Sequence, residues 1–134
     1  MPQIDNQDKV VYREFSYDIN SILFKVAKDL GRFKTEKQYG DAIEYELKQR
    51  SILYEREKSL KPSFNNEQKG RNKIDFIIYG KIILEIKAKP FLTKEDYYQT
   101  KRYLEALNLK LAILVNMRAH RVYPKRILNS KAEA

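Results

Sequence analysis

Two short isoleucine-rich segments on either side of a glycine constrain the fold of this chain more than any other feature of its sequence. Residues 73–79 and 82–89 are rich in isoleucine, and Gly80 lies between them. Short apolar runs that are bounded by a turn residue are typical of paired β-strands. The sequence therefore predicts a β-hairpin over residues 73–89.

The length of the hairpin turn decides where its charged residues lie. An odd-numbered turn, such as residues 79–81, pairs Asp75 with Glu85 and puts both carboxylates on the same face as Lys87, because side chains alternate along a strand. A two-residue turn instead pairs Asp75 with Ile86 and separates the carboxylates. The odd turn also gathers the apolar side chains on the opposite face, which favours it. Those side chains are Phe76, Ile78, Ile82, Leu84 and Ile86.

Helical and strand patterns flank the hairpin. Helices are expected over residues 11–30, from Thr35 to about residue 50, and onward from Thr93. The second and third begin at capping boxes, and Gly31 follows the end of the first. Further strands are expected over residues 52–58, 111–115 and 121–128. The order α-α-β-β-β-α-β-β predicts an α/β fold with a central mixed β-sheet flanked by helices.

The chain length and the absence of a linker predict one domain. A chain of 134 residues suits a single domain over residues 1–134, with a core of about 12–129 and short polar tails. No apolar run is long enough to span a membrane, and the N-terminal residues lack the apolar segment of a secretion signal. We therefore expect a cytoplasmic protein with no membrane partner.

The excess positive charge lies entirely in the second half of the chain. Residues 1–68 hold 12 Lys or Arg and 12 Asp or Glu, whereas residues 69–134 hold 15 and 6. The net charge of +9 therefore belongs to the second half. Clustered cations favour a phosphate-rich partner, because they release counterions when they bind nucleic acid.

Cysteine is absent and histidine occurs once, at His120. This composition excludes disulfides, zinc or iron–sulfur sites built on cysteine, and a thiol nucleophile. Any metal must be held by oxygen atoms, which suits Mg²⁺, Mn²⁺ or Ca²⁺. We expect His120, which lies in a basic segment, to be a surface residue.

Asp75 and Glu85 are the candidate metal ligands. Two adjacent carboxylates in an apolar strand repel each other, and a divalent cation compensates for that cost. Such a cation acidifies a bound water and stabilises charge on a phosphoryl oxygen. Lys87, one pleat further along, is placed to orient that water or to stabilise the transition state.

Asp75 followed by Glu85-Ile86-Lys87, with helices on either side, resembles the PD-(D/E)XK nuclease superfamily, with Ile74 in place of the usual proline. The resemblance implies that Glu36 completes the metal site and that the carbonyl of Ile86 joins it. Gln99 and Tyr103 resemble the Gln-x-x-x-Tyr motif of RecB-like nucleases. Two side chains at i and i+4 share one face of a helix.

A finer resemblance is to the small GxxExxY proteins of that superfamily. The segment from Phe33 through Glu36 to Tyr39 matches the naming motif, with Phe33 in place of its glycine. The resemblance continues through the segments 45–47, 54–57, 85–88 and 109–116 and covers about residues 15–129.

The resemblance implies a Mg²⁺- or Mn²⁺-dependent deoxyribonuclease acting on single-stranded, duplex or branched DNA, and it leaves a homodimer open. The catalytic residues would be Asp75, Glu85, Lys87 and Glu36. The substrate-binding residues would be Gln99, Tyr103, Lys73, Lys89, Lys101 and Arg102. Two alternatives stay open: a nucleic-acid-binding or regulatory module whose nuclease site is idle, and a small Holliday-junction resolvase. No nucleotide-binding loop is present, so the chain is not itself a helicase or ATPase.

Overall fold

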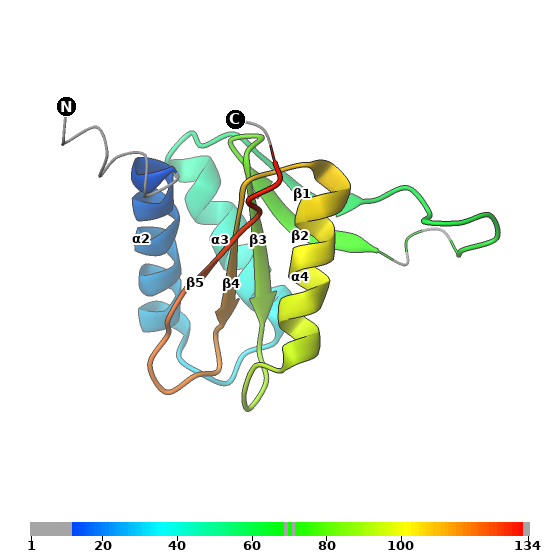
Figure 1. Ribbon diagram of the computed structural model, residues 1–134. Coiled ribbons are helices and arrows are strands. Elements are labelled where there is room, and N and C mark those ends of the chain that lie inside the picture. Colours follow the sequence, from blue (N-terminus) through cyan, green and yellow to red (C-terminus); the bar gives the residue numbers. More distant parts are fainter. Residues whose placement is uncertain (1–11, 69, 71, 133–134) are drawn as a thin grey trace.

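The computed structural model describes residues 12–68, 70 and 72–132, and its elements follow the predicted order (Figure 1). The helices are α2 (Arg13–Leu30), α3 (Glu36–Gln49) and α4 (Lys94–Leu107). The strands are β1 (Tyr54–Ser59), β2 (Lys73–Ile78), β3 (Ile82–Lys87), β4 (Leu111–Asn116) and β5 (Lys125–Leu128). The predicted α/β class and element order are therefore confirmed.

Local sequence signals fix the helix ends. Thr35 caps α3 and Thr93 caps α4, each through a capping box, and Gly31 follows α2 with a φ of 78°. The side chain of each capping threonine accepts a backbone N–H of the first turn, which satisfies a donor that has no partner inside the helix. Residue 11, the predicted start of the first helix, lies outside the described residues.

The last strand is shorter than the sequence pattern predicts. The pattern predicts a strand over residues 121–128, but β5 begins only at Lys125 and pairs with β4. Pro124 precedes it, and proline has no N–H to donate to a neighbouring strand.

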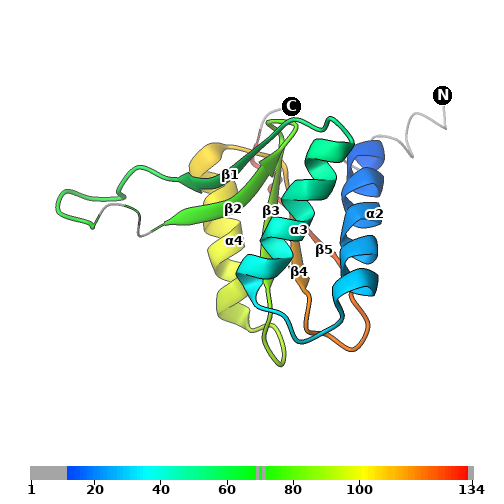
Figure 2. The same ribbon diagram turned by 180° about the vertical axis from the view of Figure 1, so that it is seen from behind.

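The five strands form one sheet in the order β1-β2-β3-β4-β5. Among the strands of the described residues only β3 and β4 are parallel neighbours, and the helix α4 connects them. The helices α2 and α3 cover one face of the sheet, and α4 covers the other (Figures 1 and 2). None of the described helices is long and apolar enough to cross a membrane.

Candidate active site

The hairpin β2–β3 has the odd turn that the sequence favours. Its pairs are Phe76–Leu84, Ile77–Ile83 and Ile78–Ile82, which leave residues 79–81 as a three-residue turn. The next step of this register sets Asp75 opposite Glu85, so the prediction of an odd turn is confirmed. The five apolar side chains expected on the opposite face are all in the core cluster beneath α2 and α3.

The two strands part where the carboxylates lie. The β2–β3 pairs end at Phe76–Leu84, whereas β2 stays paired with β1 as far as Ser59–Lys73. The side chains of the two acids replace the missing backbone hydrogen bonds. The N–H of Asp75 donates to Oε2 of Glu85 at 2.8 Å, and the N–H of Ile86 donates to Oδ2 of Asp75 at 2.7 Å. Both carboxylates are therefore fixed by backbone donors of the diverging strands.

Burial makes this pair hard to ionise. Only 2 % of Glu85 is exposed, and burial, followed by the charge of Asp75, raises its pKa to about 8. Burial is also the main cause that raises the pKa of Asp75, while the Ile86 N–H and the charge of Lys87 oppose the rise. Without a cation, the pair therefore retains a proton near neutral pH.

The second oxygens of the pair fit a divalent cation. Among the described residues, Oδ1 of Asp75 and Oε1 of Glu85 have no hydrogen-bond partner. Carboxylate oxygens are the donors that Mg²⁺ and Mn²⁺ prefer, and a positive ion between them would offset the charge of Asp75 that helps to raise the pKa of Glu85.

Two residues of α4 reach the carboxylate face of the hairpin. The ammonium of Lys87 donates to Oε1 of Gln99 at 3.4 Å. Tyr103 is buried, and its pKa is raised to about 12 by burial and then by the charges of Glu85 and Asp75. The structure therefore brings together the strand residues and the two helix residues that the sequence singles out.

Glu36 lies beside this group rather than inside it. It begins α3 and is exposed, and its Oε2 accepts the N–H of Ala88 at 3.3 Å. Its charge raises the pKa values of both Asp75 and Glu85, and it lines a cavity of about 300 Å³ together with Asp75. Within the described part of the chain, no three acidic, histidine or cysteine side chains are grouped closely enough to hold a metal ion. Glu36 is therefore not placed as a direct third ligand.

The four basic residues expected to bind substrate lie in different places. Lys73 lines the cavity beside Asp75, and Arg102 is exposed and lowers the pKa of Tyr103, although burial and the two carboxylates raise it overall. Lys89 instead forms an ion pair with Asp96 at 2.8 Å. Lys101 donates to the carbonyl of Leu128 in β5, which lies two strands from β3. The structure therefore does not bring the ammonium of Lys101 to the carboxylate pair, and that of Lys89 is engaged by Asp96.

Sequence reasoning assigned no role to two residues next to the site. Glu57 lies opposite Asp75, between two β1–β2 pairs, with a φ of 55°, and it lines the same cavity. The alternation of charged and apolar residues in 52–58 was the signal for it. Asn116, at the end of β4, bonds both the N–H and the carbonyl of Lys89. The resemblance segment 109–116 ends at this residue, but nothing in the sequence indicates its partner.

Comparison with known proteins agrees with this geometry. A family model described as the PD-(D/E)XK nuclease superfamily matches residues 13–127. Neither a curated protein nor a solved structure gives a significant match. The match spans the strand pair with Asp75 and Glu85, the helix with Gln99 and Tyr103, and the start of α3. The chain belongs to the PD-(D/E)XK nuclease superfamily.

Proposed function

We propose that this protein is a metal-dependent nuclease that hydrolyses phosphodiester bonds of DNA. The observation that carries the proposal is the pair formed by the half-buried Asp75 and the buried Glu85, whose second oxygens have no partner among the described residues. Those oxygens, with the carbonyl of Ile86, would hold Mg²⁺ or Mn²⁺, and Glu36 would contribute through a water molecule. When bound, the cation supplies a Lewis acid that acidifies water and neutralises charge on phosphoryl oxygens.

The other residues of the site would act on water and substrate. Lys87 would orient the attacking water or stabilise negative charge that develops on the phosphate. Gln99 holds the Lys87 ammonium at 3.4 Å, so it would limit the positions that this group visits. Tyr103, whose pKa is raised to about 12, would keep its proton and serve as a hydrogen-bond donor to the DNA strand.

We also assign the chain to the small GxxExxY proteins of the RecB-like branch. Glu36 and Tyr39 both support this assignment. Glu36 contacts the backbone that follows Lys87, and the buried Tyr39 hydroxyl ties the α2–α3 loop to α3 by donating to the carbonyl of Gly31. Phe33, at the glycine position of the motif, is exposed and belongs to neither core cluster of the described residues. We expect the protein to act inside the cell, where its substrate is found.

Cleavage assays with three DNA substrates test the proposal. Linear duplex, single-stranded and branched DNA would each be incubated with the protein in Mg²⁺, Mn²⁺ or EDTA. Cleavage should require the cation and should be lost in Asp75→Asn and Glu85→Gln. The matched control is Glu55→Gln, which replaces an exposed acid of β1 that forms an ion pair with Lys58. This variant should cut DNA like the wild type.

Two other results would replace the proposal. A wild-type protein that binds DNA but neither binds Mn²⁺ nor cleaves would be an idle module. Cleavage confined to four-way junctions would indicate a Holliday-junction resolvase.

A further inference from the structure

Basic residues gather where the end of α2 meets the loop that follows β4. The Nε of Arg32 donates to the carbonyl of Arg118 at 3.0 Å and joins these two distant segments. Between them lies a cavity of about 350 Å³. We call this surface the α2 patch: Lys28, Arg32, His120 and Arg121 line the cavity, and Arg118 belongs to the same loop and contacts Arg32 through its carbonyl.

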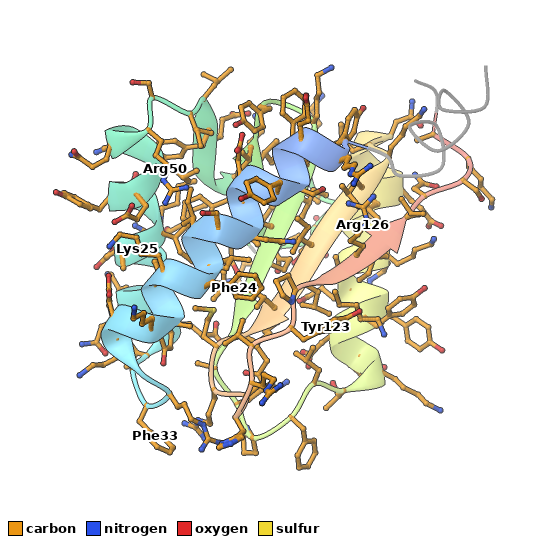
Figure 3. The ribbon with its side chains drawn as sticks, turned by 90° about the vertical axis from the view of Figure 1, so that its left-hand side faces the viewer. Phe24, Lys25, Phe33, Arg50, Tyr123 and Arg126 are labelled. Carbon is orange, nitrogen blue, oxygen red and sulfur yellow. The ribbon has the colours of Figure 1, made fainter. Side chains whose placement is uncertain are left out.

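The cavity has an apolar side as well as a charged one. Phe24, Met117 and Val122 contribute to its lining, and half of Phe24 is exposed on the outward side of α2 (Figure 3). None of the described residues that line it is acidic. A strand of nucleic acid offers the matching chemistry, because it presents negative phosphates next to sugar and base rings.

The cations of the α2 patch have no acidic partners in the described part of the chain. Elsewhere cations such as Lys25, Arg56 and Lys89 form ion pairs, whereas none of the four patch cations does. Asp29, which directly follows Lys28 in the sequence, forms its ion pair with Lys25 instead.

Two further observations point to an external anion. The Nε of Arg118 is buried and has no hydrogen-bond partner among the described residues. The sequence has no Asp or Glu between Glu105 and Glu133. A cation in the last turn of a helix has a structural explanation, since it complements the helix dipole. That explanation covers Lys28 but not Arg118 or Arg121, which lie beyond β4.

Hydrogen bonds connect the α2 patch to the strand end that carries Lys87. The N–H of Met117 donates to the carbonyl of Lys87 at 2.8 Å. The amide of Asn116 donates to the Lys89 carbonyl at 2.8 Å, and its oxygen accepts the N–H groups of Lys89 and Arg118 at 3.1 and 3.2 Å. The patch is therefore held in a fixed position relative to the carboxyl end of β3.

We propose that the α2 patch binds backbone phosphates of the nucleic-acid strand that enters the Asp75–Glu85 site, with Phe24 against a sugar or base. The proposal rests on the nuclease function proposed above and extends its substrate contacts past the end of β3 to α2. The contacts contribute to substrate affinity and not to bond cleavage. Binding without a divalent cation therefore reports on the patch separately from catalysis.

The test compares two double variants that lose the same charge. Arg32→Gln with Arg121→Gln removes two patch cations. Lys48→Gln with Lys61→Gln removes two exposed cations from α3 and from the chain after β1. Binding of labelled single-stranded and duplex DNA would be measured in EDTA over a range of salt concentrations, after thermal melting has shown that both variants are folded.

The patch variant should bind at least about tenfold more weakly at low salt, and its salt slope should fall by about 1.4 on single strands and about 1.8 on duplex. The control should bind like the wild type. Equal losses in both variants would mean that net charge alone matters, and no loss in the patch variant would mean that the patch makes no contact. Either result overturns the proposal.

A cleavage assay separates this proposal from the nuclease function. The patch variant should raise KM and leave kcat unchanged. If the wild type binds DNA through the patch but does not cleave, the nuclease function fails and the patch proposal stands. If cleavage is found with an unchanged KM in the patch variant, the patch proposal fails and the nuclease function stands.

Discussion

Replacing Glu85 with glutamine should stabilise the metal-free protein at alkaline pH. The pKa of Glu85 is about 8 in the fold against an ordinary value of 4.5, mainly because of burial. The folded chain therefore binds more protons than the unfolded chain between these values, so the free energy of unfolding falls as pH rises. Since one pKa unit corresponds to about 1.36 kcal/mol, the full loss approaches about 5 kcal/mol, with about half of it between pH 5.5 and 7.5.

Urea unfolding in EDTA across that pH range measures the effect. The Glu85→Gln variant keeps a side-chain oxygen for the Asp75 N–H but has no carboxyl group to ionise at this position, so most of the pH slope should disappear. Titrating groups that lie away from the pair are common to both proteins and cancel in the difference between them. Saturating Mg²⁺ should also flatten the wild-type slope by stabilising the ionised pair. Parallel pH profiles for wild type and Glu85→Gln would refute the reasoning.

Three further predictions concern the site and its surroundings. Lys87→Ala should keep Mn²⁺ affinity in calorimetry, or raise it, and should keep most DNA affinity, while cleavage falls about 10²-fold or more; cleavage at the wild-type rate would contradict its role. DNA affinity should fall roughly 10³-fold between about 50 and 200 mM salt if about six phosphate contacts form; a flat titration would favour another partner. Asn116→Ala should lower the free energy of unfolding in urea by about 1–3 kcal/mol, because it leaves partly buried backbone groups of Lys89 without their partner; an unchanged midpoint would show that water replaces the amide.

The hairpin register could be predicted because the two faces of β2 and β3 differ so strongly in polarity. A shift of the register by one residue would have moved Asp75 or Glu85 into the core under α2 and α3. Burying an unpaired carboxylate there is costly. The first residues of α3 and α4 could be predicted equally well, because a capping box is a local interaction between residues three positions apart.

The positions of the long basic side chains could not be predicted in the same way. A helix pattern gives the face on which Lys101 lies but not the partner that its flexible chain finds, and that partner is the Leu128 carbonyl. The position of Lys89 just after β3 could be predicted in the same way, but not the ion pair that its ammonium forms with Asp96 of α4. The α2 patch was missed because Arg32 and Arg118 are 86 residues apart and meet only in the folded chain.

The parting of β2 from β3 explains how the fold tolerates two acids at a buried position. Because β2 continues along β1 past Asp75, two backbone N–H groups lose their partners on the neighbouring strand and turn to the carboxylates. One oxygen of each acid is used in this way, so the backbone donors are satisfied whether or not a cation is present. Lys87 forms no ion pair within 4 Å in the described chain, so it offsets the charge of the pair only in part. What remains uncompensated is charge on the two free oxygens, and a divalent cation is the group that supplies the missing compensation.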